Sequence, residues 1–190
     1  MQLQDINAQS RQYNSTDLSK LLTIVMPVRI DSDERMSNLK VVLRHVCGLE
    51  CPVLLLEADK RSALKDKIDT DEGIGRLIRY EFVLDHNPVF HRTKYINKLL
   101  GEARTELVAV WDADILVDYC QVHEAVDNIM NGCTLAYPYS VEYVMLSEKE
   151  SNATRRSPDL ENLKSKKLQS VFGRPFCGGV FLVHRQRYLQ

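Results

Sequence analysis

Short apolar runs alternate with segments of helical periodicity along most of this chain. The runs lie at residues 21–28, 52–56 and 107–111, and a third strand that includes charged residues is expected at 78–84. Each run ends at a charged residue and is too short for a buried helix, which is typical of strands covered on both faces. Helices between successive strands favour parallel pairing. We therefore predict an α/β fold with a mostly parallel central sheet flanked by helices.

The remaining elements follow from spacing and from residues that end helices. Apolar positions three and four apart predict helices at 36–46, 60–68, 93–103 and 122–131, the last closed by Gly132. Further strands are expected at 135–139 and 176–184. Residues 1–20 are predicted to be a polar leader, residues 21–190 one domain, and residues 147–170 a solvated helix or loop.

Composition excludes several function classes. The chain has 190 residues and a formal net charge of −1, which suits one domain and argues against nucleic-acid binding. No apolar run approaches the roughly 20 residues that cross a bilayer, so no transmembrane segment is predicted, and a peripheral membrane association stays open. Five cysteines without a Cys-x-x-Cys pair indicate reduced thiols, and we expect a cytoplasmic protein.

Two acids follow the run at 107–111, with one small residue between them. Ligands of open α/β sheets bind at the carboxyl ends of strands, which is where Asp112 and Asp114 are expected. Like charges so close repel each other, and a hard divalent cation shared with a phosphate-bearing ligand would stabilise them. The pattern predicts a Mn²⁺ or Mg²⁺ site for a diphosphate donor. The alternative is that Asp114 or Asp118 caps the following helix.

Cationic residues open the helix that precedes the acidic strand. Arg92 and Lys94 lie at its predicted start, and Asn97 is one turn further along. Free N–H groups and the helix dipole add to such charges, so the segment predicts a phosphate-binding site. A solvated first helical turn is the alternative.

Other strand ends carry weaker signals. Glu57 can accept hydrogen bonds from a nucleobase or a ribose, or can cap the next helix. Gly178 and Gly179 allow a backbone to approach a ligand closely, or form a bulge. His184, at the end of the last strand, is a candidate for a further metal ligand or a structural histidine. Trp111 is expected in the core.

Taken in order, these segments resemble the GT-A glycosyltransferases, in particular the family-2-like enzymes that build bacterial capsule and surface polysaccharides. The resemblance covers residues 21–190. The segments that carry it are the Ile-Val-x-Pro-Val strand at 24–28 with Arg29, Glu57 at the second strand, residues 90–97, Asp112-Ala-Asp114, and residues 177–181 followed by Arg185 and Tyr188. The second strand departs from the family, which often has Asp where this chain has Glu57.

The resemblance implies a Rossmann-like GT-A fold and transfer of a sugar from a nucleotide-diphosphate donor, by default a UDP-sugar, to a saccharide or other hydroxyl acceptor. It implies inversion at the anomeric carbon, a metal held by Asp114 and Asp112, and a catalytic base beyond Gln190, so that the domain is expected to be truncated on its C-terminal side. The donor-binding residues that it implies are Pro27, Arg29, Glu57, Arg92, Lys94, Asn97, Asp112, Gly178 and Gly179.

Two other functions are consistent with parts of the pattern. Haloacid-dehalogenase-like phosphatases also have Asp-x-Asp after an apolar strand, with the first Asp as nucleophile. Their motif opens the domain and has Thr or Val where this chain has Leu116, and here it falls past mid-chain. The chain could instead be a nucleotide-binding module, or a catalytically incomplete fragment without turnover of its own. A donor-hydrolysis assay separates this reading from an active transferase.

Overall fold

The computed structural model describes residues 17–65, 67, 75–139, 144–156 and 177–190. The strands are β1 (Leu22–Val28), β2 (Val53–Asp59), β3 (Ile78–Leu84), β4 (Leu107–Trp111), β5 (Leu135–Ala136) and β6 (Val180–His184). The helices are α1 (Leu18–Leu21), α2 (Asp33–Cys47), the 3₁₀ helix η1 (Gly75–Leu77), α3 (Arg92–Glu102), α4 (Tyr119–Met130), α5 (Glu148–Arg156) and α7 (Arg185–Tyr188).

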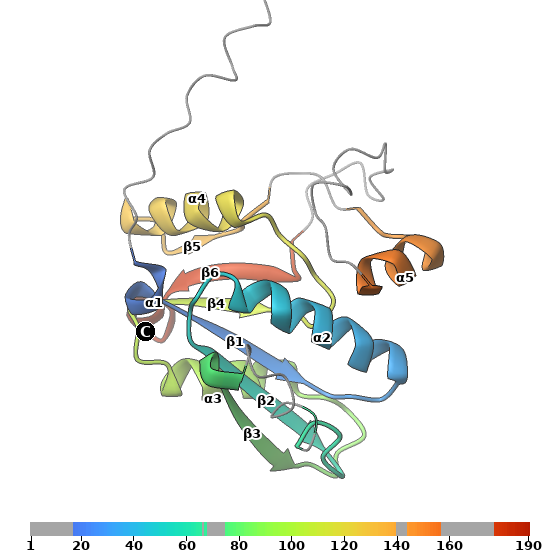
Figure 1. The fold of residues 1–190 in the computed structure, drawn as a ribbon. Coiled ribbons are helices and arrows are strands. Elements are labelled where there is room, and N and C mark those ends of the chain that lie inside the picture. Colours follow the sequence, from blue (N-terminus) through green and yellow to red (C-terminus); the bar gives the residue numbers. More distant parts are fainter. Residues whose placement is uncertain (1–16, 66, 68–74, 140–143, 157–176) are drawn as a thin grey trace, which may run out of the picture.

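The strands form one six-stranded sheet in the order β3-β2-β1-β4-β6-β5 (Figure 1). The first four are mutually parallel, while β6 runs antiparallel to both β4 and β5. This confirms the predicted α/β fold with a mostly parallel sheet. The antiparallel β6 matters for the site, because it begins at the edge where the parallel strands end.

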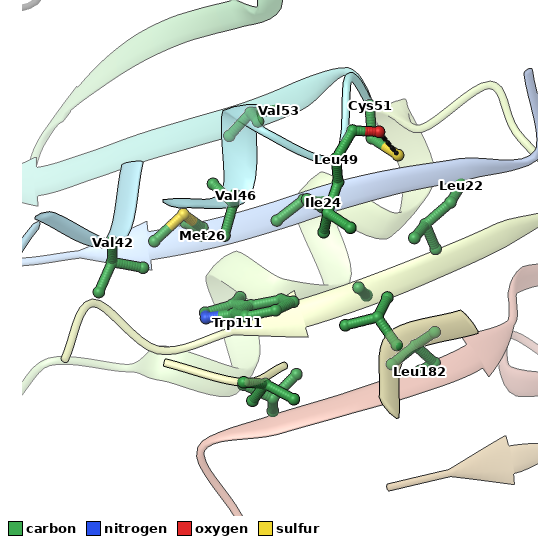
Figure 2. Close-up of a cluster of buried hydrophobic side chains, with 14 of the residues drawn as sticks. Leu22, Ile24, Met26, Val42, Val46, Leu49, Cys51, Val53, Trp111 and Leu182 are labelled. Carbon is green, nitrogen blue, oxygen red and sulfur yellow. Dashed lines mark hydrogen bonds between the residues drawn. The ribbon is translucent and has the colours of Figure 1, made fainter. Parts of the chain in front are cut away.

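Alternate residues of the central strands enter two separate apolar cores. Ile24 and Met26 of β1 face the core that contains residues of α2 and α4, whereas Val25 faces the core that contains residues of α3. The sheet is therefore covered by helices on both sides, as expected of buried parallel strands. Figure 2 shows the first core, where Trp111 lies among the side chains of β1 and α2 and is fully buried, as predicted.

Three expected elements differ from the structure. The helix predicted at 60–68 is absent from its described residues, 60–65 and 67, which form bends and turns. The backbone N–H groups of Ala63 and Leu64 bind the carboxylate of Glu57 in place of helical carbonyls. The strand predicted at 135–139 is limited to β5, and α4 begins earlier than predicted, because Asp118 forms a capping box.

Several predicted segments lie partly outside the described residues. These are most of the leader at 1–20 and the part of 147–170 that follows α5. Within the described ranges, no helix has the length and apolarity needed to span a membrane.

Candidate functional site

Functional side chains meet at one edge of the sheet. The parallel strands β1 to β4 all end there, so that Arg29, Asp85 and Asp112, which follow β1, β3 and β4, lie at the same edge. The common direction of β1 and β2 is visible in Figure 1. Because β6 is antiparallel, the glycines just before it lie at this edge too. The site therefore combines four strand ends with the start of one strand.

The loop after β4 holds one acid in place and exposes the other. The N–H of Asp112 donates to the carbonyl of Gly179 at 2.8 Å, and the indole N–H of Trp111 donates to the carbonyl of Ile115 at 2.9 Å. Asp112 is partly buried, whereas Asp114 is exposed. The loop thus presents one fixed and one accessible carboxylate within three residues.

The fixed acid is paired with a cation from α3. Arg92 donates two hydrogen bonds to Oδ1 of Asp112, from Nε at 3.0 Å and from a terminal nitrogen at 2.5 Å. Burial raises the pKa of Asp112 above its usual value, and the Arg92 charge opposes that rise. Asp114 adds to the rise as a second negative charge. Two of the predicted site residues are therefore in direct contact.

The beginning of α3 is open to a ligand. Its N-cap residue, His91, makes no side-chain hydrogen bond to the helix, and residues 90–94 line a hollow of about 600 Å³. Lys94 is exposed, with Nζ 5.3 Å from the ring centre of Tyr95, and Asn97 is exposed one turn further on. Uncapped N–H groups and cations suit an anion. The predicted phosphate-binding role of this segment stays a prediction.

Arg29 makes hydrogen bonds to the end of β2 and to the loop that follows β3. Its Nε donates to the carbonyl of Ala58 at 3.0 Å, and Nη1 donates to the carbonyls of Asn87 and Pro88 at 3.0 and 3.2 Å. Nη2 lies 3.4 Å from Asp85. The guanidinium thereby fixes the segment that leads into α3. Its predicted donor-binding role stays a prediction.

Glu57 binds the loop that follows β2, where the alternative prediction had placed a helix for it to cap. Its carboxylate is fully buried. It accepts hydrogen bonds from the N–H of Ala63 at 2.7 Å, the hydroxyl of Ser62 at 2.9 Å and the hydroxyl of Tyr80 at 2.5 Å. In this conformation no part of the carboxylate reaches an open surface. Pro27, likewise buried, pairs with the strand residue before Glu57.

The two glycines allow β6 to approach the loop that follows β4. Gly178 and Gly179 have φ angles of +144° and +76°, which favour glycine. A Cβ on Gly179 would lie 3.0 Å from Cγ1 of Ile115. The hydroxyl of Tyr139 donates to the carbonyl of Gly178 and accepts from its N–H. The close approach seen here is between backbone and loop, and contact with a ligand stays a prediction.

His184 is not part of the site, which corrects its prediction as a metal ligand. It pairs with Leu107, at the start of β4, because β6 is antiparallel to β4. Asp112 is therefore roughly 16 Å away, the rise of five strand residues. At that distant edge, Nε2 of His184 lies 3.2 Å from Glu106. The sequence pattern does not indicate whether β6 is parallel or antiparallel to β4, and this orientation decides at which edge of the sheet His184 lies.

Sequence reasoning missed two residues that shape the site. Asp85 follows β3 as Asp112 follows β4, and its position at a strand end was a usable signal. Hydrogen bonds from Tyr95 and from the N–H of Asn87 lower the pKa of Asp85. His45 donates from Nε2 to the carbonyl of Val117, at 2.7 Å, and lies on a helix far away in sequence. Nothing near it in the sequence indicated this contact.

The residues present fit a hard divalent cation that is completed by a ligand. Among the residues that the structure describes, no group of three His, Cys, Asp or Glu could hold a metal. Asp112 and Asp114 supply carboxylate oxygens only, the donor atoms that Mg²⁺ and Mn²⁺ prefer. The other ligands would be phosphate oxygens and water.

No protein-family model matches the sequence, and no curated protein matches it. Solved structures share the fold. GalNAc-T7 with UDP, GalNAc and Mn²⁺ aligns at a TM-score of 0.54 and 12% identity, covering 89% of this chain and 35% of that chain. Glucosyl-3-phosphoglycerate synthase of Mycobacterium tuberculosis aligns at 0.50 and 14%, covering 90% and 61%. The bifunctional IspDF from Campylobacter jejuni aligns at 0.50 and 10%, covering 87% and 41%.

This chain thus spans 35% to 61% of the lengths of those three proteins. At identities of 10% to 14% the likeness concerns the fold. The fold of this chain is the GT-A type, that of the nucleotide-diphospho-sugar transferases.

Proposed function

We propose that this chain is a metal-dependent glycosyltransferase domain that binds a nucleotide-diphosphate sugar and transfers the sugar to a hydroxyl acceptor. The observation that carries the proposal is the contact between Asp112 and Arg92, which joins the loop after β4 to the beginning of α3. One side suits a cation and the other suits a diphosphate. GalNAc-T7, which shares the fold, was solved with UDP, GalNAc and Mn²⁺, and this supports the proposal.

The proposed roles follow from position and charge. Asp114, with Asp112, would hold Mn²⁺ or Mg²⁺, and the bound ion would neutralise charge that develops on the diphosphate leaving group. Arg92, Lys94 and the first N–H groups of α3 would bind the phosphate oxygens and stabilise the same charge. We assign none of the described residues as the base that deprotonates the acceptor. A UDP-sugar donor, a saccharide acceptor, inversion and a role in surface polysaccharide synthesis stay predictions.

Binding is tested by a thermal-shift screen of UDP, GDP and their sugars, each with and without Mn²⁺. A ligand present at 100 times its Kd stabilises the folded state by about 2.7 kcal/mol, which for a chain of this size raises Tm by roughly 5–10 °C. We expect that shift only when nucleotide and Mn²⁺ are both present. Asp114→Ala should abolish it. Asp127→Ala, an exposed acid on α4, is the matched control and should retain it.

Turnover is tested by release of UDP from UDP-sugars, with and without saccharide acceptors. Mn²⁺-dependent release that is lost in Asp114→Ala supports a transferase. Binding without release, across all donors and acceptors, supports the nucleotide-binding module instead. Absence of any Mn²⁺-dependent nucleotide binding in the wild-type chain contradicts the proposal.

A further inference from the structure

The segment between β4 and α4, residues 112–118, is held by side chains of three aromatic residues. The indole N–H of Trp111 spans the acidic turn to reach the carbonyl of Ile115 at 2.9 Å. The imidazole of His45 donates from Nε2 to the carbonyl of Val117 at 2.7 Å. Tyr119 follows the segment and donates its hydroxyl to the backbone carbonyl of His45 at 2.7 Å. We call residues 112–118 the acidic loop.

The three rings also contact one another. The Tyr119 ring stacks on His45, with centroids 4.8 Å apart and planes at 25°. The ring centroid of His45 also lies 6.3 Å from that of Trp111. His45 therefore connects the residue that precedes the acidic loop with the residue that follows it. It belongs to the last turn of α2, so it also anchors the loop to a helix buried against the sheet.

The hydrogen bond to Val117 determines the state of the ring. A carbonyl only accepts, so Nε2 must carry a proton. Burial lowers the pKa of His45, which favours the neutral ring with its proton on that nitrogen. A neutral imidazole in this environment gives the loop a fixed donor without adding a charge to the neighbourhood of Asp112 and Asp114.

We propose that His45 is a positioning residue for the acidic loop, and that its hydrogen bond to Val117 sets the place of the Asp112 and Asp114 carboxylates for cation and diphosphate binding. The ligand part of this inference rests on the proposed function. The link passes through described contacts only: His45 fixes Val117, Trp111 fixes Ile115, and Gly179 fixes the N–H of Asp112. Loss of the His45 donor leaves the far end of the loop free to shift.

The experiment separates the donor from the ring. His45→Phe keeps an aromatic ring against Tyr119 but has no donor, whereas His45→Gln offers an amide N–H at the position of Nε2. His184→Phe, at the opposite edge of the sheet, is the matched control. Trp111 is the only tryptophan of the chain, so its indole N–H gives a single NMR signal that reports on the loop.

Without any ligand, we expect His45→Phe to shift the indole signal and to speed its exchange with solvent. His45→Gln should restore the wild-type signal, and His184→Phe should leave it unchanged. With Mn²⁺ present, the Kd for UDP should rise about fivefold in His45→Phe, the loss of one net hydrogen bond, and stay within about twofold in His45→Gln.

An unchanged indole signal in His45→Phe overturns the proposal, as does a shifted signal with an unchanged Kd for UDP. If the wild-type chain binds no UDP with Mn²⁺, the proposed function fails, and the ligand-free indole signal still decides whether His45 holds the loop. If His45→Phe does not fold, Tyr119→Phe takes its place, because it removes the hydroxyl that holds the backbone of His45. A smaller shift in the same direction supports the proposal, and no shift overturns it.

Discussion

Replacing Arg92 by glutamine should strengthen the binding of Mn²⁺ when no nucleotide is present. In the structure Arg92 occupies Oδ1 of Asp112 with two hydrogen bonds, at 3.0 and 2.5 Å, so a cation that binds this oxygen must displace it. Removing the guanidinium removes both the competitor and a like charge beside the incoming ion. The same change should weaken nucleotide binding, because Arg92 is a proposed phosphate ligand.

The exposure of the pair sets the magnitude. The side chains of Arg92 and Asp112 are 37% and 33% exposed. Fully exposed ion pairs contribute about 0.2–1 kcal/mol, and hydrogen bonds to charged groups about 1.5–3 kcal/mol. A pair with intermediate exposure should contribute about 1–2 kcal/mol, which corresponds to a roughly 5- to 30-fold tighter Kd for Mn²⁺ in Arg92→Gln.

The assay is the electron paramagnetic resonance signal of free Mn²⁺ during titration of each variant, first alone and then with saturating UDP. Lys94→Gln is the control: it removes a charge from the same helical turn that is not bonded to Asp112. Its Mn²⁺ affinity without nucleotide should change by less than about twofold, since an exposed charge is screened. UDP should raise the Mn²⁺ affinity of the wild-type chain by a larger factor than that of Arg92→Gln. Equal or weaker nucleotide-free Mn²⁺ binding by Arg92→Gln would refute the competition.

Three further predictions concern stability. Gly179→Ala should lower the free energy of unfolding by about 1–2 kcal/mol in urea denaturation, because the residue has a φ of +76°. Gly101→Ala in α3, where nothing lies within 4 Å of the added Cβ, should raise it by about 0.5 kcal/mol. Equal effects of the two substitutions would contradict the argument from φ. Glu57→Gln should lower the free energy of unfolding by about 1–3 kcal/mol, because an amide cannot accept at both positions. Unchanged stability would show that the contacts of Glu57 with this loop contribute little. Tyr95→Phe removes the hydrogen bond that contributes most to lowering the pKa of Asp85. Because this pKa is lowered in the folded state, Asp85 stabilises that state above the usual aspartate pKa of 3.8, and the stabilisation is lost as pH falls through the lowered pKa. The stability difference from wild type should therefore be larger at pH 7 than below pH 3.8, and a difference that grows in acid would contradict it.

Strand prediction succeeded where an apolar run ends at a charge. Strand β4 begins and ends at the predicted residues, because burial on both faces leaves an apolar run that charged residues bound on each side. Strand β3 also has the predicted bounds, although it is an edge strand without buried residues. The prediction of a helix at 60–68 was wrong because a contact with another part of the chain decides the structure there. The periodicity of the segment was visible, but the carboxylate of Glu57 binds the N–H groups of Ala63 and Leu64, a contact that no local pattern encodes.

The site was predictable as a set of strand ends, and its internal contacts were not. Asp112 and Arg92 were both predicted from their positions after a strand and at the start of a helix, but their direct pairing depends on how α3 packs on the sheet. His184 was misplaced because the direction of β6 is a property of the sheet. His45 was missed because its partner lies 72 residues away.

The central claim is that a cation on Asp112 and Asp114 joins this chain to a nucleotide diphosphate. The most direct test uses the unique indole N–H signal of Trp111, which lies next to Asp112 in the chain, because bound Mn²⁺ broadens nearby NMR signals. Stoichiometric Mn²⁺ with UDP should broaden the indole signal of the wild-type chain together with the phosphorus signals of UDP, and should do neither in Asp114→Ala. If the phosphorus signals broaden on binding while the Trp111 signal stays sharp, the metal lies elsewhere and the account is wrong.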